Sequence, residues 1–146
     1  MDHLYLELPK TKAFVVDLID TMYAAQGIGI ASTQVGTNVR VCIIGKDAVP
    51  GKKKDLVLVN PIYEKTSKKT TSDTEGCLSV PGFYGKVKRW KEIAVTALDE
   101  NGEPMTFEAK NFFARVIQHE VDHMNGTLFI DKATGLYEMD MKESKR

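Results

Sequence analysis

The sequence predicts an α+β fold in which mostly antiparallel sheets surround a central helix. Three observations predict it: a helical pattern near the start of the chain, strand patterns through its middle, and a second helical pattern near its end. The 146 residues are enough for one domain with a real core and too few for two. We therefore expect residues 1–146 to form a single catalytic domain, with a weakly ordered tail from about residue 132.

The first half of the chain predicts one helix followed by strands. Apolar residues recur at helical spacing over residues 11–26, and Gly27, directly after them, is expected to cap that helix. Residues 39–44, 56–59 and 62–70 are expected to be strands. A Pro-Gly-Lys loop separates the first two of these strands.

The second half predicts a hairpin and a buried helix. Residues 93–98 and 105–109 alternate in polarity on either side of a turn that contains Asn101-Gly102. Asn111 is expected to cap a helix that runs to about residue 125. This helix is apolar on two adjacent faces, so we expect it to be mostly buried. One of these faces carries Phe112, Val116, His119 and His123.

His119-Glu-Val-Asp-His123 is the motif that indicates chemistry. On a helix, side chains four residues apart lie on the same face, so the two imidazoles can bind one metal ion. Glu120 lies beside them, where a carboxylate can move the proton of a metal-activated water. The alternative is a helix that carries two surface histidines and an incidental glutamate.

A hydrolytic metal site usually needs a third protein ligand, and the sequence offers two candidates. Glu143 follows His123 at the spacing of thermolysin-type peptidases, but it lies in a charged tail that cannot hold a ligand rigidly. Cys77 lies between Gly76 and Pro81, on a segment that can present a thiolate and its neighbouring backbone N–H groups. Without the histidines, Cys77 would be an unremarkable free thiol.

Composition excludes several classes of function. Twenty basic and twenty acidic side chains cancel, so no overall charge favours nucleic acid or an anionic membrane. The lysine runs at 52–54 and 68–69 are interpreted as solvated loops. No secretory signal pattern and no membrane-spanning run is present, so we expect a cytoplasmic protein. Two cysteines make no disulfide framework, and Cys42 is expected to be a small buried hydrophobe.

Three segments of the chain resemble the signature motifs of the peptide deformylases. They are Gly27-Ile-Gly-Ile-Ala-Ser-Thr-Gln34, Glu75-Gly-Cys-Leu-Ser79 and Gln118-His-Glu-Val-Asp-His123, in the order of that family. The resemblance runs from about residue 11 to about residue 131. It implies an α+β fold and a metal-dependent hydrolase that removes the formyl group from formyl-methionine at the start of new polypeptides.

The resemblance also implies a set of site residues. It implies metal ligands at Cys77, His119 and His123, a general acid/base at Glu120, and oxyanion donors in the Gln34 amide and the backbone N–H of Leu78. The metal implied is Fe²⁺, with Zn²⁺, Ni²⁺ or Co²⁺ as substitutes. The candidate substrate-binding residues are Gly27, Ile28, Gly29, Phe112 and Val116; the two glycines allow close approach of an extended peptide, and the others could form an apolar methionine pocket.

Other interpretations stay open at this point. A general metallopeptidase or amidase could use the same metal–glutamate pair, and a metal-binding module could have lost its activity. The expected partners are nascent formyl-methionyl peptides. Transient contact with the ribosome through the basic tail is a further hypothesis. We expect the protein to be a monomer. The expected location of the protein is the cytoplasm of a bacterial-type cell, the cytoplasm of a virus-infected host cell, or an organelle. Arg89 and Glu75 could pair to support the Cys77 segment, and Trp90 is expected to serve packing.

Overall fold

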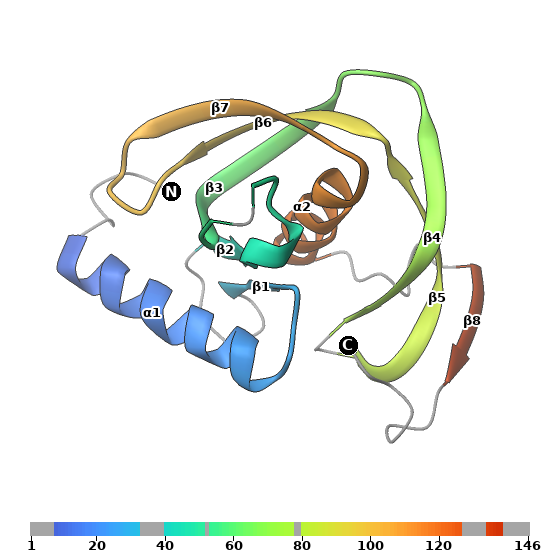
Figure 1. The fold of residues 1–146 in the computed structure, drawn as a ribbon, viewed down its shortest axis with the longest axis horizontal. Helices are drawn as coiled ribbons and strands as arrows, with labels where there is room; N and C mark the ends of the chain where they lie inside the picture. The colour runs from blue at the N-terminus through green and yellow to red at the C-terminus, as the bar shows by residue number, and fades with distance from the viewer. Residues whose placement is uncertain (1–7, 33–39, 52, 78–79, 127–133, 139–146) are drawn as a thin grey trace.

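The structure, a computed structural model, describes residues 8–32, 40–51, 53–77, 80–126 and 134–138. Within these ranges, the side chains of residues 8–11, 77, 80–82 and 134–138 are not described. These ranges form an α+β fold of two antiparallel sheets and two α-helices, which confirms the predicted fold class (Figure 1). Neither helix is long and apolar enough to cross a membrane, within the residues described.

The larger sheet has five strands in the order β1-β2-β3-β6-β7, and every neighbouring pair in it is antiparallel. Its strands are β1 (Gly29–Ala31), β2 (Val41–Ile44), β3 (Leu56–Lys65), β6 (Glu92–Leu98) and β7 (Pro104–Lys110). A short 3-10 helix, η3 (Lys46–Ala48), follows β2. The predicted hairpin is confirmed as β6 and β7, in which Ile93 pairs with Ala109 and Leu98 with Pro104.

One helix covers each face of the five-stranded sheet. Helix α1 (Leu8–Ala24) packs on one face, and α2 (Asn111–Met124) packs on the other (Figure 1). On β2, Val41 and Ile43 join the apolar cluster under α1, whereas Cys42 and Ile44 join the cluster under α2. A strand buried on both faces has no polar side, which explains the uninterrupted apolar sequence of β2.

The smaller sheet has three strands in the order β4-β5-β8, and it extends beside α2. Its strands are β4 (Thr70–Cys77), β5 (Val80–Trp90) and β8 (Thr134–Glu138). Within the segment expected to be a weakly ordered tail, β8 pairs its backbone with β5 from Phe83 to Lys86. Backbone hydrogen bonds require no particular side chains, so a charged, glycine-containing segment can still form a strand.

Strand β3 contains a β-bulge at Asn60 and Pro61. Val59 pairs with Leu98 but Ile62 pairs with Thr96, so two residues of β3 oppose one residue of β6. Asn60 has a φ of 52°. The extra residue exchanges the two faces of the strand: Leu58 packs under α2 before the bulge, and Tyr63 does so after it.

Several predicted boundaries were wrong. Strand β3 continues to Lys65 and β4 begins at Thr70, so residues 62–70 are no separate strand. The left-handed residue that ends α1 is Gln26, with a φ of 58°, whereas Gly27 follows it and donates its N–H to the carbonyl of Met22 at 2.9 Å. Asn111 is no N-cap, because it already belongs to α2, has a φ of 58° and follows the cap residue Lys110.

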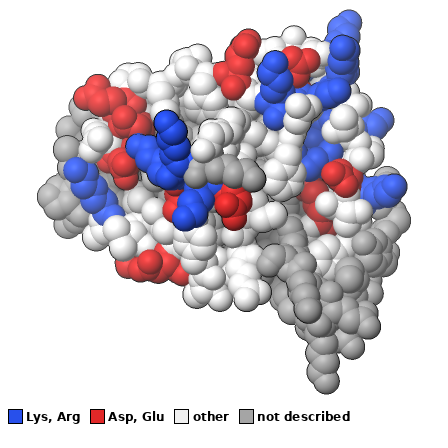
Figure 2. Space-filling model, viewed as in Figure 1, with Lys and Arg blue, Asp and Glu red and all other residues white. Residues whose placement is uncertain are grey.

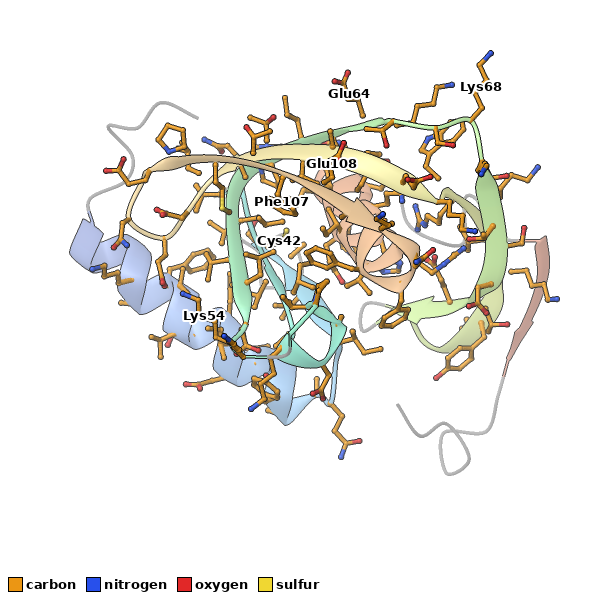
Figure 3. The ribbon with its side chains drawn as sticks, turned by 45° about the horizontal axis from the view of Figure 1, so that its top comes forward. Cys42, Lys54, Glu64, Lys68, Phe107 and Glu108 are labelled. Carbon is orange, nitrogen blue, oxygen red and sulfur yellow. The ribbon has the colours of Figure 1, made fainter. Side chains whose placement is uncertain are left out.

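The surface carries interspersed charges. Figure 2 shows acidic and basic side chains mixed over much of one face, with basic side chains gathered toward the upper right. Lys53 and Lys54 are exposed, and so are Lys68 and Lys69 at the turn between β3 and β4, which confirms the solvated-loop prediction for these lysines (Figure 3). Lys52 lies outside the described residues.

Candidate active site

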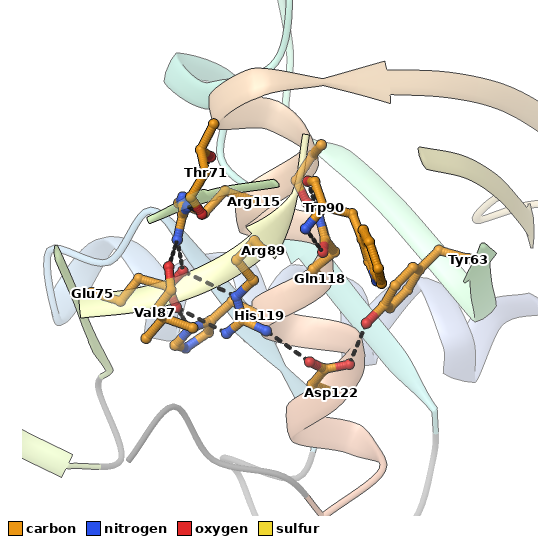
Figure 4. Close-up of polar contacts among 11 residues, drawn as sticks. Tyr63, Thr71, Glu75, Val87, Arg89, Trp90, Arg115, Gln118, His119 and Asp122 are labelled. Carbon is orange, nitrogen blue, oxygen red and sulfur yellow. Dashed lines mark hydrogen bonds and ion pairs between the residues drawn. The ribbon is translucent and has the colours of Figure 1, made fainter. Parts of the chain in front are cut away.

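Helix α2 is buried from Phe113 to Met124 and carries a polar stripe on one side. Arg115, Gln118, His119 and Asp122 follow the i, i+3, i+4, i+7 spacing that places side chains on one helix face. All four are less than one-tenth exposed. Figure 4 shows this stripe facing strands β4 and β5, which supply its partners. Buried polar groups must be hydrogen-bonded, so these partners decide where the helix can lie.

His119 is oriented by Glu75 of β4. The Nδ1 atom of His119 lies 2.8 Å from Oε1 of Glu75 (Figure 4). An ionised carboxylate can only accept hydrogen bonds, so the proton is assigned to Nδ1, and in the neutral ring the lone pair is then on Nε2. This is the tautomer that a metal-ligating histidine needs.

Glu75 is held ionised by two buried arginines. Arg89 donates from Nε to Oε2 at 3.0 Å and from a terminal nitrogen to Oε1 at 2.9 Å, and Arg115 donates to Oε2 at 2.6 Å. Burial opposes the ionisation of Glu75, but the hydrogen bonds from His119 and Arg89 and the charge of Arg89 together lower its pKa to about 2. The predicted Arg89–Glu75 pair is confirmed. It is buried, however, so it is no weak surface pair.

Asp122 extends the same set of contacts along α2. Its Oδ2 accepts a 2.7 Å hydrogen bond from Arg89, and its Oδ1 accepts one of 2.6 Å from the hydroxyl of Tyr63 on β3. Burial, the hydrogen bond to Asp122 and its negative charge raise the pKa of Tyr63, so the hydroxyl stays protonated and donates. Tyr63, Asp122, Arg89, Glu75 and His119 thus form one continuous polar chain, called here the ionic chain.

Gln118 attaches α2 to the last residue of β5. Its Nε2 donates to the carbonyl of Trp90 at 2.8 Å, and its Oε1 accepts from the N–H of Trp90 at 3.0 Å. The Trp90 ring packs against the α2-side core, and the Lys65 ammonium lies 4.4 Å from its centroid. The packing role predicted for Trp90 is therefore confirmed.

Glu120 lies on the α2 face that meets β1. Its side chain is buried, and it fills the space that a side chain at Gly29 would need. A Cβ at Gly29 would lie 2.9 Å from Oε2 of Glu120 and 3.2 Å from the Ile43 carbonyl oxygen. Gly29 is therefore required by the close approach of the candidate base, besides the substrate contact predicted for it.

Cys77 ends β4, two residues after Glu75, and its backbone pairs with Val80. Its thiol lies outside the described side chains, and so Cys77 as third ligand stays a prediction. Gln34, Leu78 and Glu143 lie outside the described residues altogether. Among the residues that are described, no group of three or more His, Cys, Asp and Glu side chains is arranged to hold a metal ion.

The second cysteine, Cys42, lies in the apolar core under α2. It is fully buried on β2, which confirms the prediction of a small buried hydrophobe. Burial raises the pKa of its thiol, and the negative charge of Glu120 raises it further. A thiol that stays neutral is a poor nucleophile.

The candidate substrate residues are placed unevenly. Gly29 lies in β1, the edge strand of the five-stranded sheet, where an extended peptide could add as a further strand. Gly27 helps to end α1, as described above, and Ile28 packs against the α2-side core while its carbonyl accepts from Gly45 at 2.7 Å. Val116 is buried in that core, whereas Phe112 is half exposed on the first turn of α2.

Sequence reasoning missed the roles of Arg115, Gln118 and Asp122. The signal was present, because Arg115, Gln118 and Asp122 recur at helical spacing in a helix with many apolar positions. In a buried helix such a stripe must be satisfied by neighbouring elements.

The chain matches known proteins over most of its length. A family model described as polypeptide deformylase matches residues 5–139. A peptide deformylase 2 of Gloeobacter violaceus is 44% identical over 115 residues, which cover 79% of this chain and 62% of that protein. A peptide deformylase 1 of a Nostoc species is 38% identical over 136 residues, which cover 93% of this chain and 73% of that protein. The chain therefore spans roughly two thirds of the length of these relatives.

Solved structures agree with these sequence matches. The crystal structure of a peptide deformylase from Synechococcus elongatus, in complex with actinonin, superposes on this chain with a TM-score of 0.80 at 39% identity. The superposition covers 86% of this chain and 68% of the Synechococcus chain. The peptide deformylase from Thermotoga maritima gives a TM-score of 0.80 at 32% identity and covers 86% of this chain and 82% of that one.

Proposed function

Because the chain belongs to the polypeptide deformylase family, we propose that it hydrolyses the formyl amide of N-terminal formyl-methionine and releases formate. The observation that carries this proposal is the arrangement around α2. His119 is fixed in the tautomer that leaves Nε2 for a metal, and Glu120, the next residue, is buried against β1. Merely holding a metal does not require Glu120, which favours a catalyst over a metal-binding module.

The donor set fits a divalent metal ion. Neutral imidazoles are good ligands, and the ionised Glu75 behind His119 makes that ring more basic. His119 and His123 would bind through their ring nitrogens, and Cys77 would supply a thiolate from the end of β4. When bound, the ion acts as a Lewis acid on the formyl carbonyl and lowers the pKa of water. We propose Fe²⁺ as the native ion, with Zn²⁺, Ni²⁺ or Co²⁺ as substitutes.

Glu120 would move the proton in both halves of the reaction. As general base, its carboxylate takes a proton from the attacking water as the new C–O bond forms at the formyl carbon. It then gives this proton to the departing amine nitrogen as the C–N bond breaks, which leaves formate and a free N-terminus. The amide of Gln34 and the N–H of Leu78 would donate hydrogen bonds to the oxyanion that develops on the formyl oxygen.

The peptide would bind alongside β1. Backbone hydrogen bonds at a strand edge depend little on the side chains of the bound peptide. Such binding suits an enzyme that processes many different polypeptides. Ile28, Phe112 and Val116 are the proposed sources of an apolar pocket for methionine, with half-exposed Phe112 at its rim. We also propose a monomer in the cytoplasm that acts on nascent chains in transient contact with the ribosome.

The test is formate release from formyl-Met-Ala by protein purified without oxygen, coupled to metal analysis. The wild type is expected to release formate, and Glu120→Ala is expected to retain the metal and lose the activity. Met-Ala without the formyl group serves as the control substrate. Cleavage of Met-Ala would favour the general metallopeptidase, and undiminished formate release by Glu120→Ala would remove the proposed base.

A further inference from the structure

The Arg115 side chain makes contacts that the proposed reaction has not yet used. Its guanidinium is buried on α2 and donates to Oε2 of Glu75 at 2.6 Å. It also donates to two backbone carbonyls, that of Thr71 at 2.8 Å and that of Val87 at 2.9 Å (Figure 4). The Thr71 hydroxyl, at 3.1 Å, is a further acceptor. One side chain therefore joins α2 to both strands of the β4–β5 hairpin.

These contacts join the two elements that carry the proposed metal ligands. Arg115 precedes His119 by one helical turn, and Glu75 precedes Cys77 by two residues on β4. A shift of the hairpin along or away from α2 would change the distance between the Cys77 backbone and both histidines. Any such shift would also lengthen the hydrogen bonds of Arg115 to Thr71 and Val87.

Neutralising Glu75 does not require Arg115 to make all these contacts. Arg89 already forms two hydrogen bonds to the same carboxylate. What distinguishes Arg115 is that two of its four acceptors are carbonyls on neighbouring strands. A planar guanidinium with five N–H groups can serve four acceptors at once, whereas an ammonium has only three N–H groups. The contacts thus indicate a role in holding position beyond a role in charge.

We propose that Arg115 is a positioning residue, which fixes the β4–β5 hairpin on α2 and so sets the third ligand at its distance from the two histidines. The proposal rests on the proposed metal site. It predicts that replacing Arg115 weakens metal binding and alters the ligand field, beyond any general loss of stability. Replacing a residue that supports metal ligands typically lowers metal affinity about 10- to 100-fold.

The test compares Arg115→Met and Arg115→Lys with the wild type and with Val15→Ala. Val15 is a buried residue of α1, on the face of the five-stranded sheet opposite to α2, so Val15→Ala controls for lost stability alone. Three quantities are measured: Zn²⁺ affinity by competition with a chelator, the absorption spectrum of the Co²⁺ form, and the urea midpoint of the metal-free protein. Sulfur-to-cobalt charge-transfer absorption reports the thiolate ligand, independently of activity.

We expect Arg115→Met to lose about 10- to 100-fold in Zn²⁺ affinity, with weaker charge-transfer absorption, whereas Val15→Ala lowers only the urea midpoint. Arg115→Lys keeps the charge beside Glu75 and is expected not to restore affinity. If Arg115→Met does not fold, the Zn²⁺ affinity and the Co²⁺ spectrum of Arg115→Lys decide between the two outcomes. Wild-type affinity and spectrum in Arg115→Lys would overturn the positioning role. If instead the wild type shows no thiolate absorption, the proposed metal site itself has failed.

Discussion

Replacing Gly29 with alanine should displace the proposed base. The new Cβ would lie 2.9 Å from Oε2 of Glu120, whereas ordinary contact begins at 3.4 Å, so the carboxylate must retreat by about 0.5 Å. The Ile43 carbonyl, 3.2 Å from the same Cβ, belongs to the backbone and yields less readily than the carboxylate. A displacement of about 1 Å in a catalytic group can cost about 100-fold, so a tenfold loss of kcat is expected. Overpacking should also cost about 1–3 kcal/mol of stability.

The assay combines formate release with a double-mutant cycle in urea. Glu120→Ala removes the atoms that a Cβ at Gly29 would meet first, so Gly29→Ala should cost less stability in that background. The difference between the two costs is expected to be at least about 0.5 kcal/mol, as for side chains in contact. An equal cost in both backgrounds, together with unchanged kcat, would refute the argument that the side chain of Glu120 is what excludes an alanine at position 29.

Three further predictions test the ionic chain, the end of α1 and the third ligand. Arg89→Met should lower the free energy of unfolding by about 3–5 kcal/mol in urea, because the buried carboxylates of Glu75 and Asp122 both lose their hydrogen bonds from Arg89; a decrease of less than about 1 kcal/mol would contradict this. Gln26→Gly should raise stability by about 1 kcal/mol, because glycine adopts a φ of 58° without the Cβ penalty; lower stability in thermal unfolding would count against it. Cys77→Ala should abolish metal binding in metal analysis, and Glu143→Ala should not; the reverse would favour the thermolysin-like ligand set.

Elements with strong local patterns could be predicted from the sequence. The β6–β7 hairpin follows from alternating polarity on both sides of a turn, and the buried α2 follows from apolar residues on two helix faces. The fold class and the family were confirmed for the same reason, since both depend on patterns and motifs within short segments. The spacing of His119, Glu120 and His123 already fixes their relative positions on a helix.

Features that depend on tertiary contacts could not be predicted in this way. Glu75 and His119 are far apart in the sequence, and only the packing of β4 against α2 brings them to 2.8 Å. Gln26 adopts a left-handed conformation next to a glycine that would have taken it at lower cost, so residue preference predicted the wrong position. Charged composition likewise suggested a weakly ordered tail where β8 forms by backbone pairing.

The bulge at Asn60 and Pro61 has a consequence for the far end of the ionic chain. If β3 kept all its residues and paired regularly beyond Val59, without the bulge, its alternation would direct Ile62 toward α2 and turn the Tyr63 phenol to the opposite face. Asp122 would then lose the hydrogen bond from the Tyr63 hydroxyl, while the one from Arg89 would remain. The support behind His119 thus depends on an irregularity in a strand that contributes no residue to the chemistry, and a one-residue slip of β3 against β6 would undo it.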